Sequence, residues 1–253
     1  MFYTNARSVV NKRNELELYI MEERPDIIGI TETWAVENIE DSELKIDGYT
    51  MIRRDRIVGD KTRGGGVLLY IQESLDVVVR EDLLNYNTLE CAWCEISVKG
   101  EKTLVGICYR APDSTQMEDE ALYQMIGGID RENVLLMGDF NFPDIDWREP
   151  DSMDDSHPFL ECINDNFLFQ FVRSSTRGNN MLDLIFASEE NMIDELRVGE
   201  PFGTSDHQII RWDFLRVNLR KSHKMGRGVK CTTILRQIMT ICGRRQNRLS
   251  GLT

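Results

Sequence analysis

Two strongly apolar segments, each ending on a carboxylate, constrain the fold of this chain more than any other feature. Residues 26–32 run from Asp26 through isoleucines to Glu32, and residues 134–139 end at Asp139. A helical pattern precedes each segment, over residues 11–24 and again before Ile129. Strands this apolar cannot face water on either side, so they are expected to lie inside a layered α/β domain.

Further strand-like segments follow the same logic, separated by polar, turn-forming stretches. They comprise residues 64–71, 89–98, 104–109, 182–186 and 209–214, and residues 160–172 suggest a helix that passes into a strand. The sequence therefore predicts a four-layer αββα sandwich, in which two mixed sheets pack together and helices flank their outer faces.

Charge divides the chain into two parts. Residues 216–253 hold 10 of the 30 Lys and Arg residues and no acid, whereas residues 1–215 hold all 43 acids and a net charge of −23. We expect residues 1–215 to form one folded domain and residues 216–253 to be a basic tail, either disordered or a short amphipathic helix. So acidic a domain binds nucleic acid poorly without cations.

The N-terminus lacks a secretion signal, and no apolar run approaches the ~18 residues that a membrane span needs. We expect a soluble, intracellular protein with no membrane partner and with reduced cysteines. Cys91 and Cys94 form a C-x-x-C pair, but on a strand residues three apart point to opposite faces, so a shared zinc is disfavoured.

The acidic residues that end or begin these strands are the candidates for chemistry. Glu32 and Asp139, with Asn141, follow two strands, whereas Asp183 and Asp206, with His207, begin two others. If the second pair of strands runs antiparallel to the first, all of these side chains meet at one edge of the sandwich. Such a cluster needs a hard cation, and Mg²⁺, with Mn²⁺ as a substitute, suits oxygen ligands and phosphate.

Short motifs along residues 3–207 carry a family resemblance. They are Tyr3-Thr4-Asn5-Ala6-Arg7-Ser8, Ile30-Thr31-Glu32-Thr33-Trp34, Arg63-Gly64-Gly65-Gly66-Val67, Tyr109-Arg110-Ala111-Pro112, Gly138-Asp139-Phe140-Asn141 and Ser205-Asp206-His207. In this order they resemble the signature of the endonuclease/exonuclease/phosphatase family, which includes enzymes like deoxyribonuclease I and the AP endonucleases. Residues 144–147 and 176–183 resemble in particular the endonuclease domains of chicken-repeat and jockey-like non-LTR (LINE) retrotransposons.

The resemblance implies a role for each matching residue at a metal site. Glu32, with Asn5 beside it, and Asp206 would be associated with the metal ion. Asp139 would deprotonate the attacking water, and Asn141 would hold the water or a phosphate oxygen in place.

The remaining matched residues would act on the phosphate or hold the substrate. His207, oriented by Asp183, would contact the phosphate, and Tyr109 would donate to it as negative charge builds. Candidates for substrate binding are Ser205, Thr176, Arg53, Arg54 and Arg63. The arginines belong to a basic loop within the acidic domain, for which an ordinary solvated loop is an equally good explanation.

The sequence departs from the family at both ends. Met1 lies so close to Asn5 that the first strand is clipped, and no reverse transcriptase domain, expected in a parent retrotransposon, follows.

Three functions remain open on this basis. The first is a DNA endonuclease, nuclear if active on DNA, that nicks one strand to leave a 3′-hydroxyl. The second is a phosphatase or phosphodiesterase acting on a small molecule or lipid headgroup through the same metal site. The third is a catalytically silent, retrotransposon-derived binding domain.

Overall fold

The computed structural model describes residues 1–36, 38–56, 64–84, 89–98, 100–130, 133–148 and 157–215. The basic tail, residues 216–253, lies outside the described residues, and so does Arg63. Among the described residues, no helix combines the length and the apolar character that crossing a bilayer requires.

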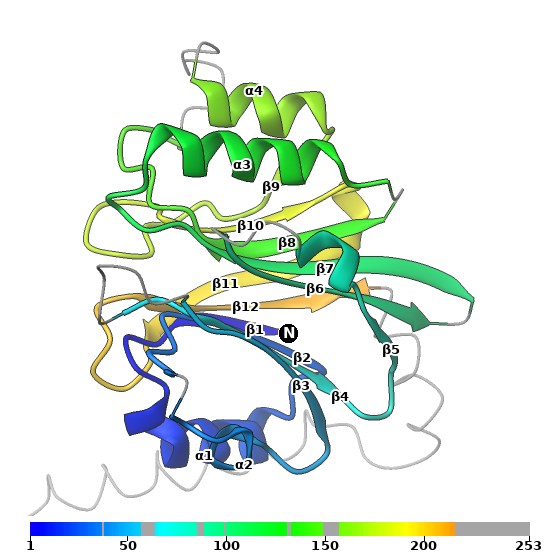
Figure 1. The fold of residues 1–253 in the computed structure, drawn as a ribbon, viewed down its shortest axis with the longest axis vertical. Helices are drawn as coiled ribbons and strands as arrows, with labels where there is room; N and C mark the ends of the chain where they lie inside the picture. The colour runs from blue at the N-terminus through cyan, green and yellow to red at the C-terminus, as the bar shows by residue number, and fades with distance from the viewer. Residues whose placement is uncertain are drawn as a thin grey trace, which may run out of the picture. The chain divides into compact units, whose positions relative to one another are not determined.

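Two six-stranded sheets pack face to face (Figure 1). Sheet A contains, in spatial order, β11 (Ile193–Pro201), β12 (Gln208–Phe214), β1 (Phe2–Asn5), β2 (Ile27–Thr31), β4 (Val67–Gln72) and β3 (Tyr49–Arg54). Sheet B contains β5 (Asp76–Val79), β6 (Glu90–Val98), β7 (Glu101–Tyr109), β8 (Val134–Asp139), β10 (Asp183–Ala187) and β9 (Phe169–Gln170). Both sheets mix parallel and antiparallel pairs, as the sequence predicts.

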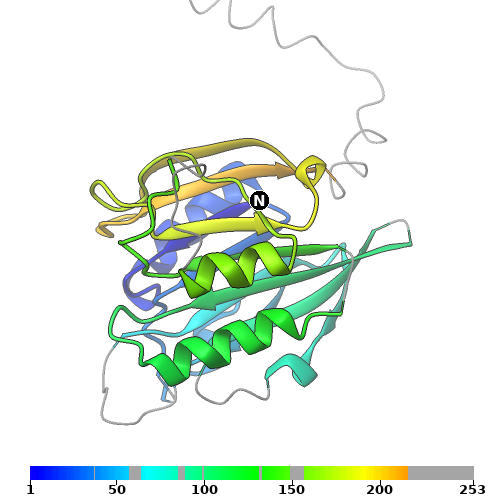
Figure 2. The same ribbon diagram turned by 90° about the horizontal axis from the view of Figure 1, so that it is seen from above.

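Helices cover the outer face of each sheet, which completes the predicted αββα sandwich (Figure 1). On sheet A lie α1 (Arg13–Glu23) and α2 (Asp41–Leu44), and on sheet B lie α3 (Gln116–Gly127) and α4 (Pro158–Asp165). Seen from above, α3 and α4 lie side by side (Figure 2). The 3₁₀ helices η1 (Val10–Lys12), η2 (Glu81–Leu84) and η4 (Glu190–Met192) occur in the connections.

Local sequence sets the helix ends. A capping box opens α3, because Thr115 accepts the backbone N–H of Glu118 while the Glu118 side chain accepts that of Thr115. Arg24 closes α1 in a left-handed conformation directly before Pro25, which cannot continue a helix.

The apolar side chains form two buried layers. One layer, which includes the fully buried Trp93, fills the space between the sheets and beneath α3 and α4. The other packs Leu16 and Ile20 of α1 against the outer face of sheet A. Burial on both faces explains why the central strands are so continuously apolar.

Three strands and the starts of two others differ from the sequence-based prediction, and one of these, β7, begins at Glu101 and not at residue 104. β3, β5 and β11 were not predicted, because these strands are partly exposed and mix polar with apolar residues. β4 begins at Val67 and not at Gly64, because Gly64, Gly65 and Gly66 all have positive φ and form the turn that leads into the strand.

Candidate active site

The predicted strand-end residues meet at one edge of the sandwich. β1, β2 and β8 end there with Asn5, Glu32 just beyond Thr31, and Asp139, while β10 begins there with Asp183. His207 directly precedes β12, which runs antiparallel to β1. The antiparallel register places Asp183 opposite Asp139, so residues far apart in the sequence form one cluster.

His207 and Asp183 form the most buried part of this cluster. The imidazole Nδ1 lies 2.7 Å from Asp183 Oδ2, and the Tyr3 hydroxyl donates to Asp183 Oδ1 at 2.9 Å. Burial alone would lower the pKa of His207, but the Asp183 and Asp139 carboxylates outweigh it and raise that pKa to about 9. His207 is therefore an imidazolium at neutral pH, held in one orientation.

Asp139 lies beside this pair and is fully buried. Its Oδ2 accepts the Asn5 side-chain amide at 2.8 Å, and its Oδ1 accepts the backbone N–H of Asn141 at 3.2 Å. Burial, followed by repulsion from Asp183, raises the pKa of Asp139 well above its usual value. A carboxylate with a raised proton affinity is suited to general-base chemistry.

Glu32 is half-buried and faces the open side of the cluster. Its Oε2 accepts the indole N–H of Trp34 at 2.9 Å, and its Oε1 accepts the Asn5 amide at 3.1 Å and the Tyr109 hydroxyl at 3.3 Å. Glu32, Trp34 and Asn141 all adopt left-handed φ angles of 48°, 54° and 49°. Such strained conformations persist where the surrounding contacts hold them, and they gather at functional sites.

Asp206 is placed differently, at the rim of the cluster. Its two oxygens pair with Arg7 Nη1 at 2.8 Å and with Arg177 Nε at 2.9 Å, and its side chain is 43% exposed. Burial would raise the pKa of Asp206, but the two arginines together outweigh burial and lower that pKa. Sequence analysis did not predict that Arg7 and Arg177 would meet at this carboxylate, because the two residues are far apart in the chain.

Three residues predicted to hold metal or substrate have defined contacts within the protein. The Asn5 amide nitrogen donates to both Glu32 and Asp139, so Asn5 links the two carboxylates. Thr176 is fully buried and cannot touch a substrate; its hydroxyl accepts the backbone N–H of Leu182 and of Asp183.

The third of these residues is Arg53, at the end of β3. Its guanidinium nitrogens donate to Asp41, Asp55 and the carbonyl oxygens of Val36 and Ile39. Every N–H of the guanidinium thus has a protein acceptor in this structure, and Arg53 ties the end of β3 to Val36, Ile39 and Asp41.

Two other predicted residues have defined but less decisive places. The buried Ser205 hydroxyl donates to the carbonyl of Asn5 at 2.7 Å and accepts the backbone N–H of His207. Ser205 thereby joins the first strand to the His207 loop. Arg54 is half-buried at the end of β3, on the same edge as Glu32.

The donor set of the cluster fits a divalent cation. Ligand atoms of Asp139, Asp183 and His207 lie within 4.8 Å of one another, and Glu32 adds a carboxylate on the open side. Asp139, Asp183 and His207 are all buried, whereas Glu32 is half-buried, so Glu32 is the more accessible carboxylate for an ion. Hard oxygen donors of this kind suit Mg²⁺ or Mn²⁺.

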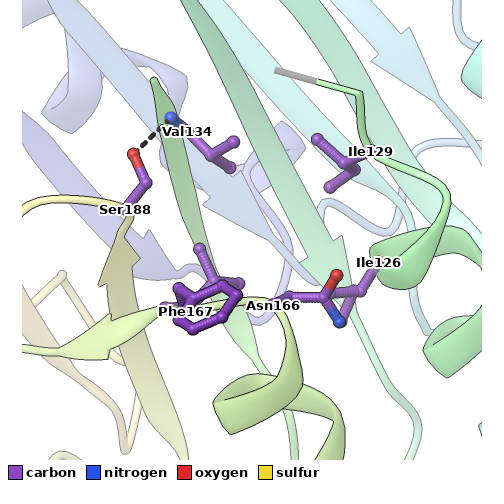
Figure 3. Close-up of a pocket in the computed structure, with 7 residues that line it drawn as sticks. Ile126, Ile129, Val134, Asn166, Phe167 and Ser188 are labelled. Atoms are coloured by element: carbon purple, nitrogen blue, oxygen red, sulfur yellow. Dashed lines mark hydrogen bonds between the residues drawn. The ribbon is translucent and has the colours of Figure 1, made fainter. Parts of the chain in front are cut away.

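A pocket elsewhere in the molecule has no such chemistry (Figure 3). It lies beside α3 and α4, and its mostly apolar lining includes Ile126, Ile129 and Phe167. The polar contact drawn there joins the Val134 backbone N–H to Ser188 Oγ at 2.9 Å. None of its lining residues belongs to the carboxylate cluster.

Comparison with known families agrees with this geometry. A family model for the endonuclease/exonuclease/phosphatase family matches residues 1–207. The chain belongs to this family. Enzymes of this family are hydrolytic nucleases and phosphatases that typically use divalent metals. A search of curated protein sequences finds no match.

Solved structures share the family fold. The endonuclease domain of TRAS1, a telomere-specific non-LTR retrotransposon, is 18% identical, with a TM-score of 0.65 over 84% of this chain and 96% of that one. AP endonuclease LMAP from Leishmania major is 14% identical, with a TM-score of 0.66 over 84% and 86% of the two chains. The 3′–5′ exonuclease NExo from Neisseria meningitidis is 18% identical, with a TM-score of 0.61 over 84% and 98%.

Proposed function

We propose that this endonuclease/exonuclease/phosphatase family protein is a divalent-metal-dependent DNA endonuclease that nicks one strand and leaves a 3′-hydroxyl. The observation that carries the proposal is the cluster of Glu32, Asp139, Asn141, Asp183 and His207 at one edge of the two sheets. The similarity to the TRAS1 endonuclease domain supports DNA as the substrate. In a retrotransposon the exposed 3′-hydroxyl would prime a partner reverse transcriptase.

The metal would be held by Glu32, with Asp206 near the same edge, and Asp139 would be left free to act on the attacking water. When bound, a divalent cation would neutralise a phosphate oxygen and stabilise the charge that builds during hydrolysis. Asp139 would accept the proton of the attacking water, because its burial raises its pKa and therefore its affinity for that proton. The left-handed backbone at Asn141 directs its N–H to Asp139 and so fixes that carboxylate.

His207 and Tyr109 would both donate hydrogen bonds to the phosphate. Because the pKa of His207 is raised to about 9, its imidazolium can donate Nε2–H to a non-bridging oxygen but cannot serve as the base. The Tyr109 hydroxyl, which donates to Glu32 in this structure, would turn its donor to the phosphate. Base and donor roles therefore fall on different residues.

A plasmid assay tests this function. Supercoiled plasmid is incubated with the full chain, with and without Mg²⁺, and conversion to nicked circles is scored beside Asp139→Asn and His207→Ala. We expect metal-dependent nicking that falls at least ~100-fold in both variants. Extension of the nicks by a DNA polymerase without prior end repair checks for the 3′-hydroxyl. Nicking that persists in Asp139→Asn would contradict the assigned base.

A second candidate is a phosphodiesterase that acts on a small molecule or lipid headgroup. The net charge of −23 over residues 1–215 favours it, because an acidic surface repels a DNA polyanion. Hydrolysis of bis(p-nitrophenyl) phosphate or an inositol phosphate, without any plasmid nicking, would favour this candidate. If neither activity is detected, the silent binding domain is the remaining explanation.

A further inference from the structure

An ion pair connects the two sheets beside the proposed active site. Arg56 follows β3 of sheet A, and Glu90 is the first residue of β6 in sheet B. Arg56 Nε lies 2.6 Å from Glu90 Oε1, and the two side chains are only 15% and 13% exposed. Removing one partner of a largely buried ion pair is costly, because the remaining charge stays buried without an opposite charge beside it.

This pair lies directly against Tyr109. The strand register sets Glu90 opposite Tyr109, the last residue of β7. The guanidinium carbon of Arg56 is 5.7 Å from the centre of the Tyr109 ring, a distance at which a cation is attracted to the ring face. The Tyr109 hydroxyl in turn points at Glu32 Oε1.

The glycine turn before β4 also contacts the Arg56–Glu90 ion pair. The backbone N–H of Gly66 donates to Glu90 Oε2, and the carbonyl of Gly65 accepts the backbone N–H of Trp34 at 3.0 Å. A Cβ at Gly65 would overlap both the Glu90 carboxylate and the Arg56 guanidinium. The glycines therefore allow hydrogen bonds to link Glu90 through the turn to Trp34, whose indole N–H donates to Glu32.

Arg56 also offsets the buried charge of Glu90. Burial raises the pKa of Glu90, and the nearby charge of Glu32 raises it further, whereas Arg56 and the Gly66 N–H lower it. With Glu90 in place the guanidinium is held at the Tyr109 ring. Without Glu90, the guanidinium would lose the ion pair that holds it there.

We propose that Arg56 and Glu90 are positioning residues, which together hold the Tyr109 phenol in place beside Glu32. The proposal rests on the proposed phosphodiesterase function, in which Tyr109 contacts the phosphate. Neither residue needs to touch the substrate. They act through Tyr109, so their effect on the reaction should disappear when the phenol hydroxyl is removed.

A double-mutant cycle on the full chain tests this dependence. Arg56→Gln and Glu90→Gln are each prepared with Tyr109 intact and with Tyr109→Phe, and plasmid nicking in Mg²⁺ gives kcat and KM. We expect kcat to fall about tenfold with Tyr109 intact, with KM changed less, and to change little in the Tyr109→Phe background. The matched control is Glu95→Gln, a buried carboxylate of the same strand that pairs with Lys102 at 2.6 Å, and it should keep the wild-type kcat.

A measurement that does not need activity separates positioning from the proposed function. In protein labelled with 3-fluorotyrosine, the ¹⁹F resonance of position 109 is the one missing from Tyr109→Phe. We expect it to shift or broaden in Arg56→Gln and Glu90→Gln, but not in Glu95→Gln.

Equal losses of kcat in both backgrounds, or an unmoved resonance, would overturn the positioning role. If the wild-type protein nicks no DNA, the proposed function fails, and the resonance alone decides whether the pair holds the phenol.

Discussion

At the scale of single residues, the charge state of His207 depends on neighbours that come from both sheets. Asp183 of sheet B accepts from the imidazole, and Tyr3 of sheet A donates to the other oxygen of the same carboxylate. Tyr3 also shares a hydrogen bond of 2.8 Å with Thr31 Oγ1. The Tyr3 hydroxyl is therefore held by two hydrogen bonds, one to Asp183 and one to Thr31. The imidazolium is therefore maintained by a chain of buried groups and not by His207 alone.

The raised pKa of His207 predicts a stability that depends on pH. The folded protein binds this proton more tightly than the unfolded chain, whose histidine has a pKa of about 6.5. The stabilisation is thus fully present below about pH 6.5 and is lost as the pH rises through about 9. The raised pKa of Asp139 acts in the same direction.

Urea unfolding in chelator-treated buffer across this range checks the prediction. The unfolding midpoint should fall with rising pH, with a smaller slope in His207→Gln. A midpoint that does not change between about pH 6.5 and about pH 9 would contradict the assigned protonation.

Tyr3→Phe tests the contribution of the phenol to the cluster. Removing the hydroxyl leaves Asp183 Oδ1 without this buried donor, which should cost about 1–3 kcal/mol in the free energy of unfolding and slow nicking at least ~10-fold. Tyr70→Phe is the control, because its buried hydroxyl donates to the Leu44 carbonyl outside the cluster. Similar nicking by the two variants would show that Tyr3 has no role beyond stability.

Sequence analysis located the strand-end acids but not their partners. An apolar run reveals where a strand ends, so Glu32, Asp139 and Asp183 could be placed at one edge once antiparallel pairing was assumed. The sequence could not show that Thr176 is buried, or that the donors of Arg53 are all used, because burial and hydrogen bonding depend on residues distant in the chain.

At the scale of elements, β6 and β7 are joined by a close fit between a large and a small residue. Trp93 of β6 is fully buried and lies opposite Gly106 of β7, where a Cβ would overlap the indole ring. A glycine within a strand often marks such a close approach. This fit keeps β7 in register, and β7 carries Tyr109 at its end.

Gly106→Ala should therefore destabilise sheet B. We expect a loss of about 1–3 kcal/mol in the free energy of unfolding, since the indole would have to shift within a packed core. Urea unfolding followed by tryptophan fluorescence measures it. Gly199→Ala in the outer strand β11, where the added methyl meets only ordinary contacts, is the control and should cost less than ~1 kcal/mol. Equal costs would refute the packing argument.

Elements were predictable where one physical signal dominated. The buried strands β2 and β8 were identified from their continuous apolar runs, and α3 was identified from its helical periodicity. β5 and β11 were missed because they lie at sheet edges, where polar and apolar residues both occur and the alternation is weak.

At the scale of the whole molecule, every residue of the cluster lies within the sandwich, which ends with β12 at Phe214. We therefore predict that residues 1–215 alone retain metal-dependent cleavage at about the rate of the full chain. Plasmid nicking by the two proteins at equal concentration checks this. If the full chain cleaves the plasmid and residues 1–215 do not, the prediction is wrong and residues 216–253 are required for cleavage.

Sheet A is completed by strands from opposite ends of the sandwich, because β1 pairs with both β2 and β12. A ribosome must therefore synthesise almost the entire domain before the first strand obtains its second neighbour. A nascent chain that terminates before β12 would present an open β1 edge, ready to pair with other polypeptides, and would lack the imidazole. We therefore expect premature termination to yield an aggregation-prone product with an incomplete carboxylate cluster.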